Sequence, residues 1–526
     1  MTYDAIIIGG GHNGLVAAAY LAKAGRKVLV LEQRAVLGGA AATEEVLPGF
    51  RFNTGAHDAG LFRQEIIDEL ALEKHGLSFI SSPVAAFTPR LQADAPPLIL
   101  WNDLKKTAET LSAISEKDAE SFPRYIEHIR TMTAMLDEII LRTPPNLFEN
   151  RFADLTPWLK SGLKFKRMGK QDMMAFLRVL PMSAWQFLDE WFESERLKGL
   201  LGSTSIFGSL QGPMAAGTAF MLFYQHLGAQ NSGLASSRQI KGGIGQLSDA
   251  LAAVVRAQGG EIHTETPVQK IVLENGVATG VQLQGGEIIS SKIVISNADP
   301  KRTFFELVGA RHLGPEFNRK VRAIKMKGST AKLNLALSAL PEFVNAPSGQ
   351  EHLQGHIVIC PSLEYLERAY DDAKYGRFSE QPLLDITIPS LLDPSLAPEG
   401  KHVMSITMRY APFVSKKADC EHYGNHVRNK IIDTLADYAP NLRDCIEHSQ
   451  VLTAIDWQQE YGMTEGSILH GQMGLDQLLF MRPIPGFGQY HTPIENLYLC
   501  GAGTHPGGGV TGAPGRNAAK EILKKR

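Results

Sequence analysis

The sequence holds few cysteines and no surplus of either charge. Four of its 526 residues are cysteines, and they stand far apart, without a Cys-x-x-Cys pair. This excludes a redox dithiol or a zinc ribbon and fits a reducing cytosol. Lysine and arginine number 53 against 55 aspartate and glutamate, so we expect no nucleic acid partner. No group of His, Asp and Glu has metal-ligand spacing, and we expect no metal site.

An uninterrupted apolar run long enough to cross a membrane is also missing. The segment 4–25 is apolar, but the glycines at 9–14 divide it into halves too short for a span. The N-terminus lacks the basic region and small-residue cleavage site of a secretory signal, so we expect a cytoplasmic protein. With 44% hydrophobic residues, the chain is typical of a globular protein of two or more domains.

The first residues carry the pattern of a βαβ unit. The continuous apolar run 5–8 predicts a strand buried on both faces of a parallel sheet. An Ala- and Leu-rich helix is predicted at 15–24, where Gly25 provides a C-cap. A second buried strand is predicted at 27–31.

A glycine motif, Gly9-x-Gly11-x-x-Gly14, stands between the first strand and the helix. The first glycine permits a tight turn, the second lets a pyrophosphate approach the backbone, and the third lets the helix pack on the strand. Glu32 ends the second strand, where a carboxylate accepts hydrogen bonds from ribose hydroxyls. The residues predicted to bind a dinucleotide here are Gly9, Gly11, His12, Asn13, Gly14, Glu32, Gly38 and Gly39.

The chain ends with a second glycine-rich segment. A strand is predicted at 496–500, and a helix from about 513 follows the loop between them. A helix N-terminus in this place is suited to negative charge on a reduced flavin ring, which favours FAD over NAD. The residues predicted to contact the flavin are Gly501, Gly503, Gly509, Val510 and Gly512.

The middle of the chain predicts a discontinuous architecture. Residues 240–298 read as a helix at 246–258 followed by strands, 105–230 read as mostly helical, and 330–480 mix strands, at 331–337 and 402–409 among others, with loops. We therefore expect an α/β protein, in which a discontinuous Rossmann-type FAD-binding domain carries an inserted α+β substrate domain containing a helical subdomain. The predicted limits are 1–75, 236–300 and 486–526 for the FAD-binding domain, and 76–235 and 301–485 for the substrate domain.

The chain resembles the phytoene (carotenoid) desaturase superfamily of FAD-dependent oxidoreductases, and within it the phytoene dehydrogenase-related branch. The matching stretches are Gly11–Tyr20, Gly38–Ala41 with Thr43–Glu45, Gly466–Gly471 with Leu475–Gln477, and Leu497–Ala518. The resemblance implies a flavin-linked oxidoreductase with a poorly defined substrate. By analogy with such flavoproteins, Val268 is expected to contact adenine through its backbone.

The branch also carries the label pyridine nucleotide-disulfide oxidoreductase domain-containing protein. A disulfide reductase needs a redox cysteine pair and usually a second nucleotide fingerprint. This sequence contains neither, so we expect no disulfide chemistry. Oxygen or a quinone is then the expected electron acceptor, in place of a nicotinamide.

The resemblance implies a desaturase or dehydrogenase that transfers hydride from a hydrophobic, polyene- or lipid-like substrate to the flavin. An amine oxidase and a flavin-binding regulatory or scaffold protein are the alternatives. The catalytic residue is unassigned, because His57, Asp58, His470 and His505 each suit either proton transfer or a structural hydrogen bond. Arg516 suits either the cofactor phosphates or a surface ion pair.

A basic and apolar stretch at 157–201 suggests peripheral membrane contact. A segment of this kind can lie at a bilayer interface, and it can equally be a solvated loop before core helices. The resemblance favours the first alternative, because polyene desaturases take substrates from membranes. Its basic residues are Lys160, Lys164, Lys166, Arg167 and Lys170.

Overall fold

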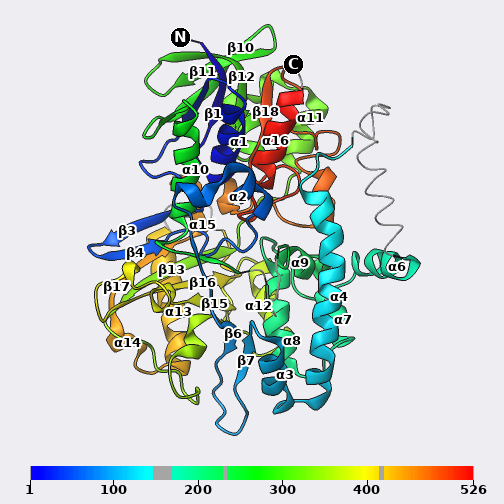
Figure 1. The fold of residues 1–526 in the computed structure, drawn as a ribbon, viewed down its shortest axis with the longest axis vertical. Helices are drawn as coiled ribbons and strands as arrows, with labels where there is room; N and C mark the ends of the chain where they lie inside the picture. Colours follow the sequence, from blue (N-terminus) through cyan, green and yellow to red (C-terminus); the bar gives the residue numbers. More distant parts are fainter. Residues whose placement is uncertain (1, 146–168, 229–233, 236, 414–419, 525–526) are drawn as a thin grey trace.

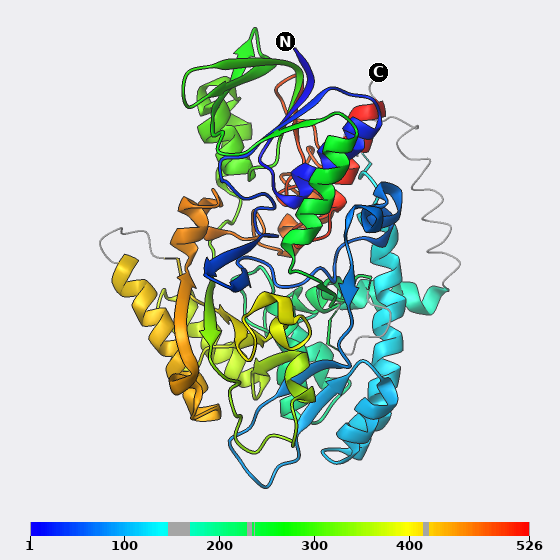
Figure 2. The same cartoon turned by 60° about the vertical axis from the view of Figure 1, so that its left-hand side comes forward.

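The computed structural model describes all residues except 1, 146–168, 229–233, 236, 414–419 and 525–526. Two seven-stranded sheets form its framework, the first near both chain termini and the second below it (Figure 1). Figure 2, turned by 60°, shows the same two bodies one above the other, with long crossings of the chain between them.

The first sheet collects strands from three distant parts of the chain. Its order is β10-β11-β12-β1-β2-β9, and β18 pairs with β12. The strands β1, β2, β9, β12 and β18 are parallel, and β10 and β11 extend the sheet as an antiparallel hairpin. The bounds are β1 Tyr3–Ile8, β2 Val28–Leu31, β9 Glu261–His263, β10 Val268–Glu274, β11 Val277–Leu283, β12 Ile288–Ser296 and β18 Leu497–Leu499.

Both faces of this sheet are covered, which is why its strands read as continuous apolar runs. Side chains such as Ile7 and Val30 point to one face, where they pack against the helices α1 His12–Lys23, α10 Gly245–Ala257 and α16 Ala513–Lys524. Ile6 and Leu29 point to the other face, against the π-helix Arg302–Val308 and α11 Pro315–Arg322. The predicted Rossmann-type α/β layer is confirmed, with α1 beginning three residues earlier than expected.

The second sheet has the order β17-β13-β16-β15-β14-β6-β7. Its bounds are β6 Val84–Thr88, β7 Leu98–Trp101, β13 Thr330–Leu337, β14 His356–Ile359, β15 Leu384–Thr387, β16 His402–Arg409 and β17 Ile446–Leu452. One face packs its leucines, isoleucines and methionines against α13 Cys420–Tyr438. The opposite face carries the polar side chains considered below.

A helical part stands beside the second sheet, as predicted for 105–230 (Figure 1). Its longest member, α4 Glu116–Ile140, is N-capped by Ser115, whose hydroxyl accepts from the Asp118 N–H. The aromatic ring of Tyr125 packs at 5.0 Å from that of Phe192 in its core. The other helices here are α3 Leu104–Ser112, α6 Lys170–Val179, α7 Ala184–Asp189, α8 Glu195–Gly202, α9 Thr218–Gln225 and α12 Leu363–Lys374.

Smaller elements complete the fold. They are β3 Thr43–Leu47, β4 Phe50–Asn53, β5 Phe79–Ile80, β8 Gln239–Ile240, α2 Gln64–Leu70, α14 Leu442–Cys445 and α15 Ala454–Gln459. The domain limits given above stay a prediction. In the part of the chain that the structure describes, no helix is long and apolar enough to cross a membrane.

Candidate functional site

Two cavities meet between the sheets. The loop cavity lies at the carboxyl ends of β1 and β2, and its walls include the segments 8–13, 31–34 and 38–40. The sheet cavity, of about 180 Å³, lies against the polar face of the second sheet. The two cavities adjoin, because four residues line both of them: His12, Ala40, Ile468 and Ala502. Ligands of parallel α/β sheets bind at the carboxyl ends of the strands, where the loop cavity lies.

The glycine motif shapes the loop cavity. Gly9 has a φ of +96°, which favours glycine, and a Cβ on Gly14 would stand 2.3 Å from the Gly9 carbonyl oxygen. Gly11 is the N-cap of α1, so the helix N-terminus opens toward the cavity. The second glycine pair is bound to this loop, because the Gly38 N–H donates to the Gly10 carbonyl at 2.8 Å.

Glu32 lies at the end of β2, as predicted, and lines the loop cavity. Its two carboxylate oxygens accept from the backbone N–H groups of Gly10, at 2.7 Å, and Arg34, at 2.9 Å. Burial raises the pKa of Glu32, and the two N–H donors oppose that shift. Each carboxylate oxygen has a second lone pair, so Glu32 can hold the loop and still accept from a ligand hydroxyl.

Several buried polar atoms around the loop cavity have no hydrogen-bond partner among the residues that the structure describes. They are His12 Nε2, Asn13 Oδ1, Arg34 Nη1 and His470 Nδ1, and all four residues line the cavity. Because buried polar groups are rarely left unpaired, these atoms fit a polar ligand such as a dinucleotide. Val268, at the first residue of β10, lines the same cavity.

The terminal glycine loop separates into two groups of residues. Gly509 and Val510 line the sheet cavity. Gly501, Gly503 and Gly512 line neither cavity. A Cβ at any of these three positions would stand within 2.7 Å of neighbouring protein atoms. The requirement for glycine at these three positions is therefore explained by packing against protein, and their contact with a flavin stays a prediction.

The floor of the sheet cavity is a set of polar side chains on adjacent strands. Lys332 of β13 pairs with Thr407 of β16, and Thr407 pairs with Asp385 of β15. Thr330 and Arg409 form the neighbouring cross-strand pair. Since side chains alternate between faces along a strand, these five groups point to the same side, into the cavity.

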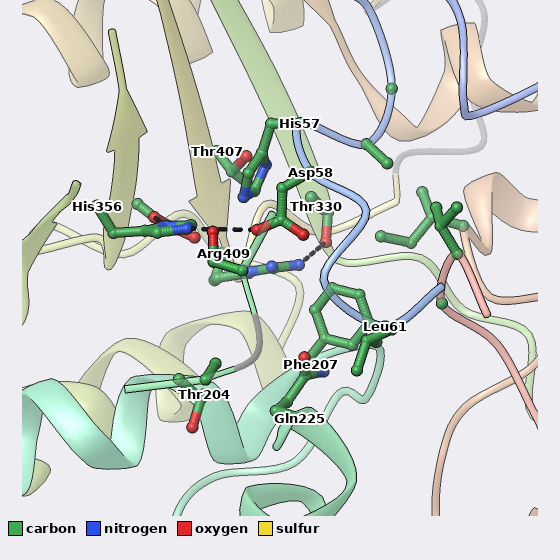
Figure 3. A pocket seen from close by; sticks show the side chains of 18 of the residues that line it. His57, Asp58, Leu61, Thr204, Phe207, Gln225, Thr330, His356, Thr407 and Arg409 are labelled. Carbon is green, nitrogen blue, oxygen red and sulfur yellow. Dashed lines mark hydrogen bonds and ion pairs between the residues drawn. The ribbon is translucent and has the colours of Figure 1, made fainter. Parts of the chain in front are cut away.

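His356, from β14, lies between two carboxylates (Figure 3). Its Nδ1 is 2.8 Å from Asp385 Oδ1, and its Nε2 is 3.6 Å from Asp58 Oδ2. Burial lowers the pKa of His356, but Asp385 and Asp58 outweigh burial and raise it to about 10. The same contacts hold the pKa of both carboxyl groups below the ordinary range. The triad is therefore an imidazolium between two carboxylates.

His57 and Lys332 are buried beside this triad and differ from it in charge. The His57 ring stands 5.1 Å from the His356 ring, and burial lowers its pKa to about 4. Lys332 donates to the carbonyl oxygens of Asn53 and Gly55, and burial lowers its pKa to about 7. At neutral pH the cavity thus contains a neutral imidazole and an amine that titrates.

One group of ligand-type atoms in the described residues has the spacing of a metal site. The atoms offered by His57, Asp58 and His356 lie within 4.8 Å of one another. A protonated His356 donates from both ring nitrogens and has no lone pair for a metal. The expectation of no metal site therefore stays a prediction, with this cluster as the place to test it.

The remaining acid–base candidates divide by position. His57 and Asp58 line the sheet cavity and His470 the loop cavity, whereas His505 lines neither, and its Nε2 stands 3.2 Å from the Ile139 carbonyl oxygen. Arg516 lines neither cavity and forms an ion pair with Glu69 at 2.6 Å, as in the second of its two alternatives, although the arginine is buried and not at the surface. The basic residues at 160–167 lie outside the described residues.

Three cysteines are described, and none of them lines either cavity. Cys360, Cys445 and Cys500 are buried as free thiols, and burial raises the pKa of each. A raised pKa suppresses the thiolate that disulfide exchange requires. Disulfide exchange is therefore disfavoured at these three residues, and the absence of disulfide chemistry stays a prediction.

Five polar residues of the floor do not stand out in the sequence: Thr330, Lys332, Asp385, Thr407 and Arg409. A signal for them exists. The strands at 330–337 and 402–409 coincide with strands that the sequence predicts. In both segments polar residues occupy alternate positions among apolar ones. In a strand buried on both faces, this alternation marks a polar face that must meet a partner or a ligand.

Two joined cavities, one built on a dinucleotide loop and one with titratable groups, are the arrangement that a flavin-dependent oxidoreductase needs. The chain belongs to the flavin containing amine oxidoreductase family, whose model matches residues 14–523.

Its relatives agree with this assignment. The chain is 37% identical to the rat pyridine nucleotide-disulfide oxidoreductase domain-containing protein 2, over 99% of this chain and 93% of that protein. It is 28% identical to one of the subunits of limonene dehydrogenase from Castellaniella defragrans, over 99% and 94%. It is 26% identical to the phytoene desaturase of Fusarium fujikuroi, over 99% and 89%. The resemblance to phytoene desaturases is thus confirmed as a more distant one.

A solved structure supports the fold. The crystal structure of an oxidoreductase from Methanosarcina mazei matches 99% of this chain and 100% of that chain, with a TM-score of 0.62 at 18% identity.

Proposed function

We propose that the protein is an FAD-dependent dehydrogenase or desaturase that acts on a largely apolar carbon substrate. The observation that carries this proposal is the junction of the two cavities at His12, Ala40, Ile468 and Ala502. A cofactor that fills the loop cavity and ends at this junction would present its reactive ring to the sheet cavity. When bound, FAD supplies a two-electron acceptor for hydride.

The residues of the loop cavity suit the parts of FAD in order along its length. Glu32 and Val268 would hold the adenosine, and the loop 9–14 with Gly38 and Gly39 the pyrophosphate. The terminal loop at Gly509 and Val510 would lie against the flavin. The α16 N-terminus follows that loop, where its dipole favours negative charge on the ring.

The walls of the sheet cavity favour an apolar body for the substrate. They include Leu61, Phe207, Val358, Leu383 and Leu469. The names of two relatives, a limonene dehydrogenase and a phytoene desaturase, refer to apolar carbon compounds, and they support the same class here.

We assign proton acceptance to His57. Dehydrogenation of a C–C bond removes one hydride and one proton, and the proton needs an acceptor unless a delocalised cation loses it to solvent. His57 lines the sheet cavity, its ring makes no hydrogen bond to the described residues, and its lowered pKa keeps the ring neutral at pH 7. Lys332 is less suited, because two backbone carbonyls already bind its ammonium group.

Anaerobic reduction of the bound flavin by a panel of polyenes, quinols and amines tests the function. We expect bleaching by an apolar unsaturated compound. His57→Gln should slow that bleaching about 100-fold or more while substrate affinity holds, and the FAD content of the variant is the control. An equal rate in the variant would remove His57 from the reaction.

The two alternatives are outcomes of the same assay. Bleaching only by amines would identify an amine oxidase, although Arg409 and the His356 imidazolium place positive charge where an ammonium would bind. Flavin that no compound reduces would favour a regulatory or scaffold protein. Oxygen or a quinone is proposed as the electron acceptor, because the sequence contains no second G-x-G-x-x-G motif in the order strand, motif, helix and acidic residue.

Peripheral membrane contact is also proposed, at α6. This helix exposes three large apolar side chains, Met173, Met174 and Leu177, and it begins at the exposed Lys170. Flotation with anionic liposomes at low salt tests the contact. Replacing the three apolar residues by serine should abolish flotation, and full flotation of that variant would refute a role for α6.

A further inference from the structure

Arg409 is a buried cation that forms no ion pair with a described residue, and the carboxylate of Asp385 acts on it only from beyond ion-pair distance. It lies on β16 with 8% of its surface exposed, and it lines the sheet cavity. Of its five N–H donors, one meets an acceptor in the described residues, the Thr330 hydroxyl at 3.4 Å. The guanidinium also stacks at 5.0 Å over the Phe207 ring. No carboxylate oxygen of a described residue lies within ion-pair distance.

The other buried arginines show how this chain normally treats such a group. Arg482, 2% exposed, donates five hydrogen bonds to backbone carbonyls. Arg63 pairs with Asp137 at 2.9 Å, and Arg516 pairs with Glu69 at 2.6 Å. A buried guanidinium is costly without such partners. Arg63 also has donors without a hydrogen bond, Nε and Nη1, but it has its ion pair. Arg409 is therefore the exception among these four in having one hydrogen bond and no ion pair to the described residues, and it lines a cavity.

A second unpaired donor lines the same cavity. The side-chain Nε2 of Gln225, on α9, is buried and has no hydrogen-bond partner in the described part of the chain. Figure 3 shows Gln225 and Phe207 on the helical side of the cavity, across from the strands that carry Arg409 and Thr330. The nearby carboxylates Asp58 and Asp385 are committed to His356.

We infer that Arg409 anchors a carboxylate at one end of the substrate, so that the sheet cavity takes an apolar chain that ends in a carboxylate. This inference rests on the proposed function and names its substrate class. A planar guanidinium matches a carboxylate through two parallel hydrogen bonds. An ammonium would be repelled by Arg409, and a pure hydrocarbon would leave its donors unpaired.

A single negative charge suits the site better than two. Asp58 and Asp385 lie in the same cavity, and repulsion from them grows with each added negative charge on the ligand. Arg409 and the His356 imidazolium supply the opposing positive charge. A carboxylate is therefore favoured over a phosphate, which shares the same recognition chemistry.

Binding of matched twelve-carbon compounds to the oxidised holoenzyme tests the inference. Dodecanoate, dodecanol, dodecylamine and dodecyl phosphate differ only in the end group. Affinities are measured by calorimetry and by the shift of the flavin spectrum. We expect dodecanoate to bind about 10-fold or more tightly than dodecanol or dodecylamine.

Variants assign this preference to one residue. Arg409→Gln should remove the preference for dodecanoate and leave the affinity for dodecanol unchanged. Arg368→Gln is the matched control, because Arg368 is exposed and pairs with Glu364 away from the cavity. Arg409→Lys keeps the charge and should retain a reduced preference for dodecanoate. This variant replaces Arg409→Gln in the binding test if the glutamine variant loses its FAD or its fold.

Three results would overturn the inference. They are equal affinity of the wild type for dodecanoate and dodecanol, an equal loss for both compounds in Arg409→Gln, and tighter Arg409-dependent binding of dodecyl phosphate. None of these measurements requires turnover. Failure of every compound to reduce the flavin would therefore count against the proposed reaction, and the binding result would stand separately.

Discussion

Replacing Glu32 is the sharpest test of the cofactor assignment. Its carboxylate accepts two short backbone hydrogen bonds, from Gly10 at 2.7 Å and Arg34 at 2.9 Å, at the wall of the loop cavity. If the adenosine ribose also donates to it, removal of the charge eliminates hydrogen bonds worth about 1.5–3 kcal/mol. Because about 1.4 kcal/mol corresponds to a tenfold change in the dissociation constant, FAD should bind about 10- to 150-fold more weakly.

The choice of variant separates cofactor binding from the fold of the loop. Glu32→Ala also leaves the Gly10 N–H without its partner, whereas Glu32→Gln keeps one acceptor oxygen for the loop and removes the charge. Both should bind FAD more weakly, and the glutamine variant should keep more of the thermal stability of the apoprotein than the alanine variant, because it retains one of the two acceptor oxygens. Glu261→Gln, on β9 of the same sheet, is the control, because Glu261 hydrogen-bonds Tyr3 and lines neither cavity.

FAD fluorescence during equilibrium dialysis measures the dissociation constant of each variant. The same titration with FMN should show much weaker binding, because FMN lacks the adenosine half that Glu32 addresses. A glutamine variant that keeps a full complement of FAD after dialysis would refute the role given to Glu32.

Three further outcomes are expected. NADH and NADPH should reduce the bound flavin slowly or not at all in stopped-flow absorbance, and rapid stoichiometric bleaching would contradict the absence of a second nucleotide site in the described residues. Acid should destabilise the protein, because burial lowers the pKa of four histidines to about 4 in the folded state. As the pH falls, the unfolded chain therefore binds protons at these histidines before the folded chain does. The four are His12, His57, His226 and His505. Stability should then fall as the pH decreases from 6.5 to 4, by up to about 3 kcal/mol for each histidine, and a melting temperature that is flat over this range would exclude the effect. Dialysis against EDTA should leave the melting temperature and flavin content unchanged, and co-purified stoichiometric zinc would show that the histidine–aspartate cluster holds a metal.

The sequence predicted the parts of this molecule whose physics is local. Apolar runs and one residue with positive φ are enough to predict the strand 5–8, the turn at Gly9 and the helix after it. All three are present, as β1 of the first sheet, the loop that follows it and α1. The helix at 246–258 and the strand at 496–500 follow the same logic. Even so, α1 begins at His12, because Gly11 acts as the N-cap, and no side-chain pattern marks that position.

The residues of the sheet cavity were harder to predict, because they come together only through strand pairing. Lys332, Asp385 and Thr407 are far apart in the chain, and the register of β13, β16 and β15 makes them neighbours. His356 reaches the site from a fourth strand, and Asp58 from the loop that follows β4. Periodicity predicted two of these strands, but it carries no information on their order.

The polar face of the second sheet also constrains what the cavity can take. Arg409 and the imidazolium of His356 are cationic, Asp58 and Asp385 are anionic, and the amine of Lys332 titrates near neutral pH, with a pKa of about 7. Four of these groups have partners in the protein, but a purely apolar ligand would remove water from the free donors of Arg409 without replacing it, a cost of several kcal/mol. A ligand with an apolar body and one anionic end avoids that cost, because its charge meets the one cation that the described part of the chain leaves unpaired there. Within the alternating polar residues of these two strands, we therefore interpret Arg409 as the one that selects a substrate end group, whereas Lys332 already has partners in the backbone carbonyls of Asn53 and Gly55.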